Sequence, residues 1–231
     1  MDEGAKIIVI ARDEEKLAAF QSEFPNQIEI VKGDISKGKI IQNVITKLGN
    51  RFLDGVLVNA GGPPAKSFIE TGMEDWDSAY STILRWKVEF TKAILPKLIE
   101  QEYGRIVYIE SSSTKQPIAN LVLSNSLRLA VVGFVKTLSQ EVAVNGITLN
   151  ILAPGFHETD AAKRLFVKRS EVEGISIPEA KIKYTSAIPV GQMGDANNFG
   201  SIAAWLLSPV SKYITGQTIS VDGGANKGTF G

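Results

Sequence analysis

Short runs of apolar, often β-branched residues alternate with longer amphipathic stretches along most of this chain. Such short runs predict strands buried on both faces, and stretches of ten or more residues with helical spacing predict helices. The predicted strands are 6–11, 28–34, 52–60, 105–111, 147–153 and 217–221. The predicted helices are 14–24, 36–49, 74–102, 119–144 and 196–208, and we interpret 156–189 as a polar, irregular stretch.

This alternation predicts an α/β fold, because parallel strands need helical crossover connections. We expect a three-layer, doubly wound, mostly parallel sheet of the Rossmann-like type, forming a single domain over residues 1–231. In such sheets ligands bind beyond the carboxyl ends of the strands. The loops predicted at that edge are Ala11-Arg12, Asp34-Ile35, Asn59-Ala60-Gly61-Gly62, Ser111-Ser112-Ser113 and Pro154-Gly155.

Composition narrows the range of functions. The chain has 25 basic and 25 acidic residues, so it has no surplus of positive charge for a nucleic acid backbone. It has no cysteine and a single histidine, His157, which excludes disulfides, thiolate catalysis and the common zinc sites, and we expect no bound metal. No apolar run is long enough to span a membrane, and acids occupy the N-terminus where a signal peptide would be basic. We therefore predict a cytoplasmic protein without nucleic acid or membrane partners.

Three motifs at this spacing resemble the short-chain dehydrogenase/reductase family. They are Asn59-Ala60-Gly61, the strand Gly104-Arg105-Ile106-Val107 leading to Ser111, and the segment 189–224, which resembles the 3-oxoacyl-(acyl-carrier-protein) reductase branch. The resemblance implies an NAD(P)-dependent oxidoreductase that reduces a carbonyl or oxidises an alcohol on a small molecule. It also implies a homodimer or homotetramer, and it makes 156–189 the region that covers the substrate.

The N-terminus departs from the family pattern. The family begins with a strand, a glycine-rich turn and a helix that hold the cofactor pyrophosphate, and here the chain starts at what resembles the end of that helix. The first strand of the family is central in its sheet, so its absence would leave two neighbouring strands unpaired. Either the sequence lacks an N-terminal segment or the sheet is completed in another way. We favour the first, because local and global signals usually agree in foldable sequences.

The catalytic positions implied by the resemblance are mostly substituted. Ser111 matches the family's serine, but Ser124 stands thirteen positions later where the tyrosine is expected, and Arg128 replaces the lysine. Ile83, seven positions after Trp76, replaces the asparagine. A serine hydroxyl is a much weaker acid than a phenol, and a guanidinium is no proton shuttle. Ser111, Ser124 and Arg128 are nevertheless the candidate catalytic residues.

Several strand-end residues are candidates for cofactor binding. Arg12 occupies the position where the family discriminates cofactors, and a guanidinium there suits the 2′-phosphate of NADP better than NAD, although NAD stays an alternative. A surface arginine at a strand end is also common. The resemblance further implies contacts from the following residues: Asp34, Ile35, Asn59, Ala60, Gly61, Pro154, Gly155 and Thr159.

Some of these residues also have a purely structural interpretation. Asp34 could belong to the start of the helix at 36–49, Asn59 could stabilise a turn, and Ser111 could bond to the backbone at a strand end. Glu110 could replace the missing acid if burial raised its pKa, but we favour a solvated glutamate at a strand edge. For His157 we favour a surface position in its loop.

Two hypotheses follow. The first is an NADP-linked short-chain oxidoreductase, with Ser111 and Ser124 at the carbonyl and Arg128 at the nicotinamide ribose or a substrate carboxylate. The second is a catalytically impaired, reductase-like protein that binds a nucleotide or serves as a scaffold.

Overall fold

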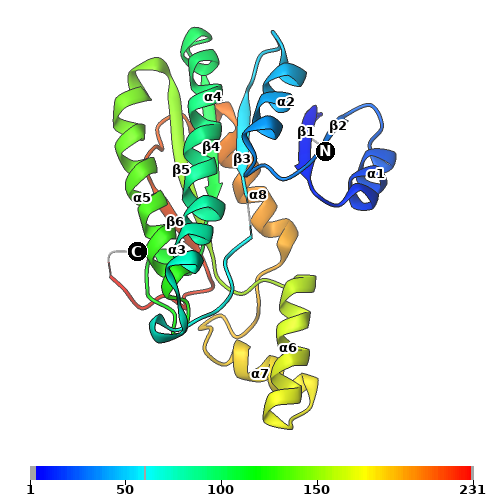
Figure 1. Cartoon of the computed structure of the whole chain (residues 1–231), viewed down its shortest axis with the longest axis vertical. Coiled ribbons are helices and arrows are strands. Elements are labelled where there is room, and N and C mark those ends of the chain that lie inside the picture. Colours follow the sequence, from blue (N-terminus) through cyan, green and yellow to red (C-terminus); the bar gives the residue numbers. More distant parts are fainter. Residues whose placement is uncertain (1–3, 60, 230–231) are drawn as a thin grey trace.

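The strands of the described part all run parallel, but they form two sheets (Figure 1). In this computed structural model, which describes residues 4–59 and 61–229, β1 (Ile7–Ala11) pairs with β2 (Ile28–Lys32). The second sheet has the order β3-β4-β5-β6, with bounds Gly55–Val58, Gly104–Ile109, Ile147–Pro154 and Thr218–Val221. The predicted α/β fold with a parallel sheet is confirmed.

The sheet is interrupted between β1 and β3. Within the part of the chain that the structure describes, neither strand has a partner on its second edge. Apolar side chains are exposed on both strands, with Ile7 37% and Leu57 50% accessible to solvent. The sequence predicts that these two neighbouring strands are unpaired if the first strand of the family is absent. None of the described residues fills the gap between β1 and β3.

Helices cover both faces of the larger sheet. Successive strand residues point to opposite faces, and apolar side chains on each face pack against helices. In β4, Ile106 and Tyr108 belong to the core beneath α4 and α5, whereas Val107 and Ile109 pack toward α8. Figure 1 shows α4 and α5 on one side of this sheet and α8 on the other. This is the predicted three-layer arrangement.

The starts of the first two helices follow from local hydrogen bonds of two aspartates. The side chain of Asp13 accepts a hydrogen bond from Lys16 N at the start of α1 (Glu14–Glu23). α2 (Gly38–Leu48) begins two residues after the predicted Ser36. The reason is that Ser36 N donates to the carboxylate of Asp34, which keeps Ser36 in the preceding turn.

The predicted helix 74–102 is three consecutive segments. α3 (Met73–Ala79) leads into a π-helical turn (Tyr80–Arg85) and then into α4 (Trp86–Glu100). π-helical turns are rare and occur often at functional sites. The turn contains Ile83.

The predicted helices 119–144 and 196–208 are also present, as α5 and α8. α5 (Val122–Val142) begins three residues later than predicted, and Asn125 ties its first turn to the preceding loop through both backbone groups of Ile118. α8 (Ala196–Leu207) is capped by Asp195. Short 3₁₀ turns lie at Phe68–Glu70, Ser112–Thr114, Ala143–Asn145 and Pro209–Ser211. None of the described helices is long and apolar enough to cross a membrane.

The stretch 156–189 was wrongly predicted to be irregular. It contains α6 (Asp160–Glu173) and α7 (Ile177–Thr185), which Figure 1 shows projecting beyond the sheet. Thr159 caps α6, and Ser176 forms a reciprocal capping box with Glu179 at the start of α7. A small apolar core then joins the two helices, with Phe166 and Ala180 buried within it.

Candidate active site

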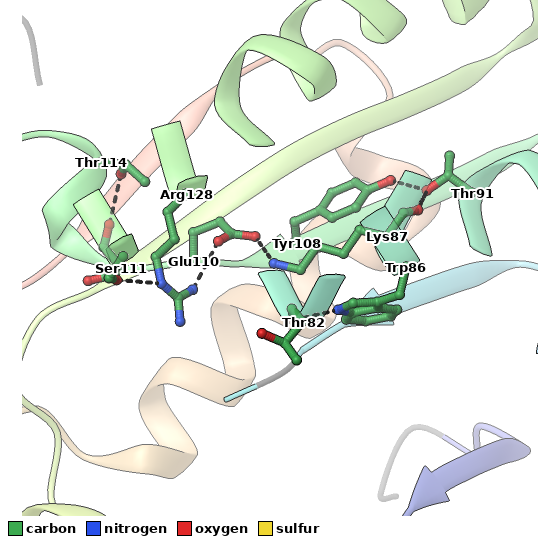
Figure 2. A network of polar contacts seen from close by, with 10 residues as sticks. Thr82, Trp86, Lys87, Thr91, Tyr108, Glu110, Ser111, Thr114 and Arg128 are labelled. Carbon is green, nitrogen blue, oxygen red and sulfur yellow. Dashed lines mark hydrogen bonds and ion pairs between the residues drawn. The ribbon is translucent and has the colours of Figure 1, made fainter. Parts of the chain in front are cut away.

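A buried cluster of charged side chains lies beneath the carboxyl end of β4 (Figure 2). Glu110, directly after β4, forms ion pairs with Lys87 of α4 and with Arg128 of α5. Arg128 Nη1 lies 2.9 Å from Glu110 Oε2, and the second carboxylate oxygen faces Lys87 Nζ. The side chains are 0% (Glu110), 1% (Lys87) and 8% (Arg128) exposed.

The cluster reaches the two substituted catalytic positions through Arg128. Its Nε donates a hydrogen bond to Ser124 Oγ over 3.1 Å. The two residues are four apart on α5, so they lie one above the other on the same helix face. Ser124 and Arg128 are both buried. The structure thus joins two of the three predicted catalytic residues in one contact.

The interpretation of Glu110 as a solvated glutamate at a strand edge was wrong. β4 is an interior strand between β3 and β5. Alternation along the strand places Glu110 on the same face as Ile106 and Tyr108, beneath α4 and α5. A carboxylate in that position needs a partner of opposite charge, and it has two.

Lys87 is a residue of this cluster that the sequence analysis missed. A signal for it exists, because Ile83, Lys87, Phe90 and Ile94 recur with helical spacing and all four are buried. A lysine within such an apolar face of a predicted helix requires a buried acid. The sequence does not indicate that Glu110, 23 positions later, is that acid.

The cluster continues through hydroxyl groups toward the interior of the sheet. Thr91 Oγ1 donates to the carbonyl oxygen of Lys87 over 2.6 Å and lies 2.7 Å from the hydroxyl of Tyr108. Because the threonine hydrogen is used, Tyr108 is the donor in the second contact. Burial raises the pKa of Tyr108 above its usual value, so this phenol stays protonated.

Burial also alters the ionisation of Lys87. Loss of solvent lowers its pKa from the usual value, the carboxylate of Glu110 opposes this effect, and the positive charge of Arg128 adds to it. The net direction is a decrease, because the loss of solvent outweighs the attraction of the carboxylate.

The glycine loop after β3 lies against Arg128. A Cβ atom at Gly62 would stand 3.3 Å from Arg128 Nη2, so the missing side chain allows this close approach. Lys66 further along the loop forms an isolated parallel bridge with Leu121, just before α5. Asn59 and Gly61 are exposed in this loop, and the predicted contact of Ala60 lies outside the described residues.

Ser111 is the third predicted catalytic residue. It follows Glu110 at the end of β4, and its Oγ accepts a hydrogen bond from Ser113 N over 3.1 Å while capping the 3₁₀ turn. Its carbonyl oxygen accepts from the hydroxyl of Thr114. The residue is half-buried, so its hydroxyl hydrogen is free for a ligand at the sheet edge. The backbone interpretation and a site role are thus compatible.

Ile83 occupies the position of the family's asparagine. It lies in the π-helical turn and is 1% exposed. Its apolar side chain offers no group that could hold a water molecule. The distortion of the helix is therefore present without the polar residue expected there.

The predicted cofactor residues after β1 and β2 lie at the carboxyl ends of these strands. Asp34 accepts from the backbone N–H of Ser36, which lowers the pKa of its carboxyl, and the nearby positive charge of Arg12 adds a smaller effect. Arg12 is exposed, whereas Ile35 packs against the core. Asp34 and Ser36 also line an open pocket of about 530 Å³ between the start of α2 and the π-helical turn.

Pro154, Gly155 and Thr159 follow β5. Pro154 pairs with Val221 of β6, and Gly155 N donates to the same residue's carbonyl oxygen. A Cβ at Gly155 would lie 2.7 Å from Asp222 Cβ, so glycine is required for packing there. Thr159 uses its hydroxyl to cap α6. A cofactor contact of these residues stays a prediction.

His157 lies half-buried in its loop and makes specific contacts there. Its ring packs edge-on against Phe199 at a centroid distance of 5.0 Å, and Nδ1 lies 3.2 Å from the carbonyl oxygen of Gly155. His157 also forms an isolated bridge with Gly194. Its contacts hold the loop after β5 against the start of α8.

Comparison with known proteins identifies the family. Residues 1–226 match the profile described as enoyl-(acyl carrier protein) reductase. A 3-oxoacyl-(acyl-carrier-protein) reductase of Rickettsia prowazekii is 30% identical over 224 residues, which are 96% of this chain and 86% of that protein. The NADPH-dependent reductase BacG of Bacillus subtilis is 29% identical over 202 residues, or 86% of this chain and 77% of that protein.

Solved structures show the same fold. A crystal structure of a variant of the actinorhodin polyketide ketoreductase with NADPH has a TM-score of 0.90 and 28% identity, covering 98% of this chain and 90% of that one. YwfH, an NADPH-dependent reductase of bacilysin biosynthesis, has a TM-score of 0.91 at 24% identity, covering 98% and 91%, and supports the fold alone. The chain belongs to the short-chain dehydrogenase/reductase family and is an oxidoreductase of the short-chain type.

Proposed function

We propose that this protein uses NADP(H) to reduce a carbonyl or oxidise an alcohol on a small molecule. The observation that carries the proposal is the contact between Arg128 and Ser124, held from behind by Glu110. Each of these three buried charged side chains is costly without the others, so their joint presence favours a maintained site over one that has lost its function. NAD stays the alternative cofactor.

The described residues fit the two ends of a dinucleotide. Arg12 beside Asp34 would offer a cation and a carboxylate to a phosphorylated ribose and adenine. Ser111 and Ser124 would offer hydroxyl groups to the reacting carbonyl. Asn59, Gly61 and Gly155 would approach the cofactor between these ends. In the gap between the neighbouring edges of β1 and β3, the described residues provide no glycine-rich turn that could bind the pyrophosphate.

The chemistry expected of this chain is electrostatic. NADPH, when bound, supplies the hydride, and the carbonyl oxygen gains a proton from water. Because Ser124 Oγ accepts from Arg128 Nε, its own hydrogen is free to point to the substrate oxygen, as is that of Ser111. The guanidinium beside Ser124 would stabilise negative charge that develops on this oxygen. The site thereby replaces a proton-donating phenol by polarising hydroxyls and a fixed cation.

A second function is favoured by the substitutions themselves. Without tyrosine, lysine and asparagine, the protein could bind a nucleotide or serve as a scaffold without hydride transfer. NADPH fluorescence titration and carbonyl-dependent NADPH oxidation separate the two, measured on the 231-residue chain and on a version extended upstream. We expect saturable binding and oxidation. Saturable binding without oxidation of any carbonyl would favour the scaffold, and no binding by either form would contradict both.

We further propose that α6 and α7 cover the substrate and that the protein is a cytoplasmic homodimer or homotetramer. The faces of α4 and α5, together with the C-terminal strand, would form the subunit contacts. Exposed apolar residues on these helices, Ile99 and Leu129, support this arrangement. Light scattering coupled to size exclusion would contradict it by showing a monomer at micromolar concentration.

A further inference from the structure

The buried cluster carries one more positive charge than negative. Lys87 and Arg128 are cations, Glu110 is the carboxylate that both contact, and each side chain is less than a tenth exposed. Among residues 4–59 and 61–229, neither cation forms an ion pair with a second acid. A buried charge without a counter-charge is costly. The cluster is therefore one negative charge short.

The unused donor of the cluster is Arg128 Nη2. Nε and Nη1 bind Ser124 and Glu110, but no described residue accepts a hydrogen bond from Nη2. This atom lies beside Gly62, an exposed residue in the loop at the carboxyl edge of the sheet. An incoming group could therefore reach it from the same edge as Ser124.

A neutral group would not balance the cluster. Ribose hydroxyls could accept a hydrogen bond from Nη2, but they would leave the surplus charge in place. A carboxylate supplies both the acceptor and the missing charge, and charge-assisted bonds from arginine to carboxylate are the stronger ones. The charge count thus favours an acid over a sugar hydroxyl at this position.

We propose that the substrate is a small oxo acid, or the corresponding hydroxy acid. Arg128 Nη2 binds its carboxylate, and its carbonyl oxygen lies at Ser124. Lys87 is a positioning residue: it shares Glu110 with Arg128, so that Glu110 does not fully neutralise the guanidinium. This inference rests on the proposed function and adds the substrate class to it.

Pairs of compounds that differ only in charge test the inference. NADPH oxidation is measured with acetoacetate against methyl acetoacetate, and with levulinate against methyl levulinate. We expect kcat/KM to favour the acid of at least one pair by about tenfold or more, the value of one charge-assisted hydrogen bond. Equal kcat/KM for acid and ester in both pairs, or preference for the esters, would overturn the proposal.

Lys87→Met tests the positioning role, with Lys92→Met as the matched control on the exposed face of α4. In Lys87→Met, Glu110 neutralises Arg128, so we expect KM for the acid to rise while KM for its ester stays within about twofold. Lys92→Met should keep the wild-type ratio. A purely structural role would weaken acid and ester alike. The wild-type comparison needs no variant, so it decides the substrate class even if Lys87→Met fails to fold.

A binding measurement separates this inference from the proposed function. Calorimetric titration of acetoacetate and methyl acetoacetate, with and without NADP⁺, requires no turnover. We expect heat of binding for the acid alone, and its loss in Arg128→Gln. Tighter binding of the acid without NADPH oxidation would contradict the proposed activity while supporting the carboxylate site. Binding of neither compound, or of both equally, would contradict the carboxylate site.

Discussion

The Nε of Arg128 donates a hydrogen bond to Ser124 Oγ over 3.1 Å, while Nη1 of the same guanidinium binds Glu110. Two positions of α5 that are usually tyrosine and lysine in the family are thus joined directly, and Glu110 at the end of β4 fixes the pair. The planar guanidinium makes this possible, because its donors point in fixed, different directions. The substitutions at 124 and 128 are best understood together, as one replaced unit.

Arg128→Lys should abolish this geometry while it retains the charge. A single ammonium group at the end of a flexible stem cannot hold Ser124 and Glu110 in the same way. We expect kcat for carbonyl reduction to fall by about 10²- to 10³-fold, the effect of removing one oxyanion-stabilising donor. Steady-state kinetics measure it, with Arg85→Lys, an exposed arginine, as the control. A kcat within about twofold of wild type would show that Arg128 is not needed for the chemistry.

Glu110→Gln should destabilise the fold. Lys87 and Arg128 would remain buried without a counter-charge, and removing one partner of a buried ion pair costs about 3–5 kcal/mol. Urea unfolding measures the change in the free energy of unfolding. Glu100→Gln, on the exposed end of α4, should stay within about 0.5 kcal/mol of wild type. Equal stability of the two variants would contradict the burial and pairing of Glu110.

Lys87 should make stability increase with pH in the alkaline range. Burial lowers its pKa in the folded state below the usual 10.5, so the unfolded state holds this proton more tightly. Between the folded pKa and 10.5, the unfolded chain binds more protons, and the free energy of unfolding rises with pH. Below the pKa of the folded state, both states bind this proton, and Lys87 no longer makes the free energy of unfolding depend on pH.

Urea unfolding at a series of pH values checks this, comparing wild type, Lys87→Met and Lys92→Met. The methionine at 87 should remove the rise, and the methionine at 92 should retain it. An identical pH dependence in all three proteins would mean that the pKa of Lys87 is the same in the folded and unfolded states.

Gly62→Ala should hinder the approach of a ligand to Arg128. The added methyl would lie 3.3 Å from Nη2, and the guanidinium cannot move away without losing Ser124 or Glu110. We expect KM for acetoacetate to rise, with little change in the free energy of unfolding because Gly62 is exposed. Gly72→Ala, with open space around its Cβ position, is the control. An unchanged KM would separate the glycine loop from the substrate site.

The sequence predicts the strands and most helices because their signals are local. The run Ile7–Ala11 is apolar and β-branched, and Asp13 is an evident cap for the helix that follows. Helices α6 and α7 were missed although local signals exist for them, above all the capping box formed by Ser176 and Glu179. Only a small apolar core joins the two helices, so the segment 156–189 contains few apolar residues with helical spacing. Its polar composition therefore led to the prediction of an irregular stretch.

The charged cluster could not be predicted in full, because its contacts join residues far apart in the chain. Spacing alone places Ser124 and Arg128 on one face of a helix. That Glu110 faces the same interior, and that Lys87 meets it there, depends on the packing of α4 and α5 over β4. The interpretation of Glu110 as solvated failed for this reason, since it considered only its neighbours in sequence.

Carbonyl-dependent oxidation of NADPH by the wild-type protein and by Ser124→Ala tests the central claim most directly. Both proteins are first titrated with NADPH, so that loss of turnover is distinguished from loss of cofactor binding. The account predicts that wild type oxidises NADPH with a carbonyl substrate, and that Ser124→Ala binds it equally well but turns over about 10²-fold more slowly. Equal turnover by the two proteins, or saturable binding without turnover by wild type, would contradict it.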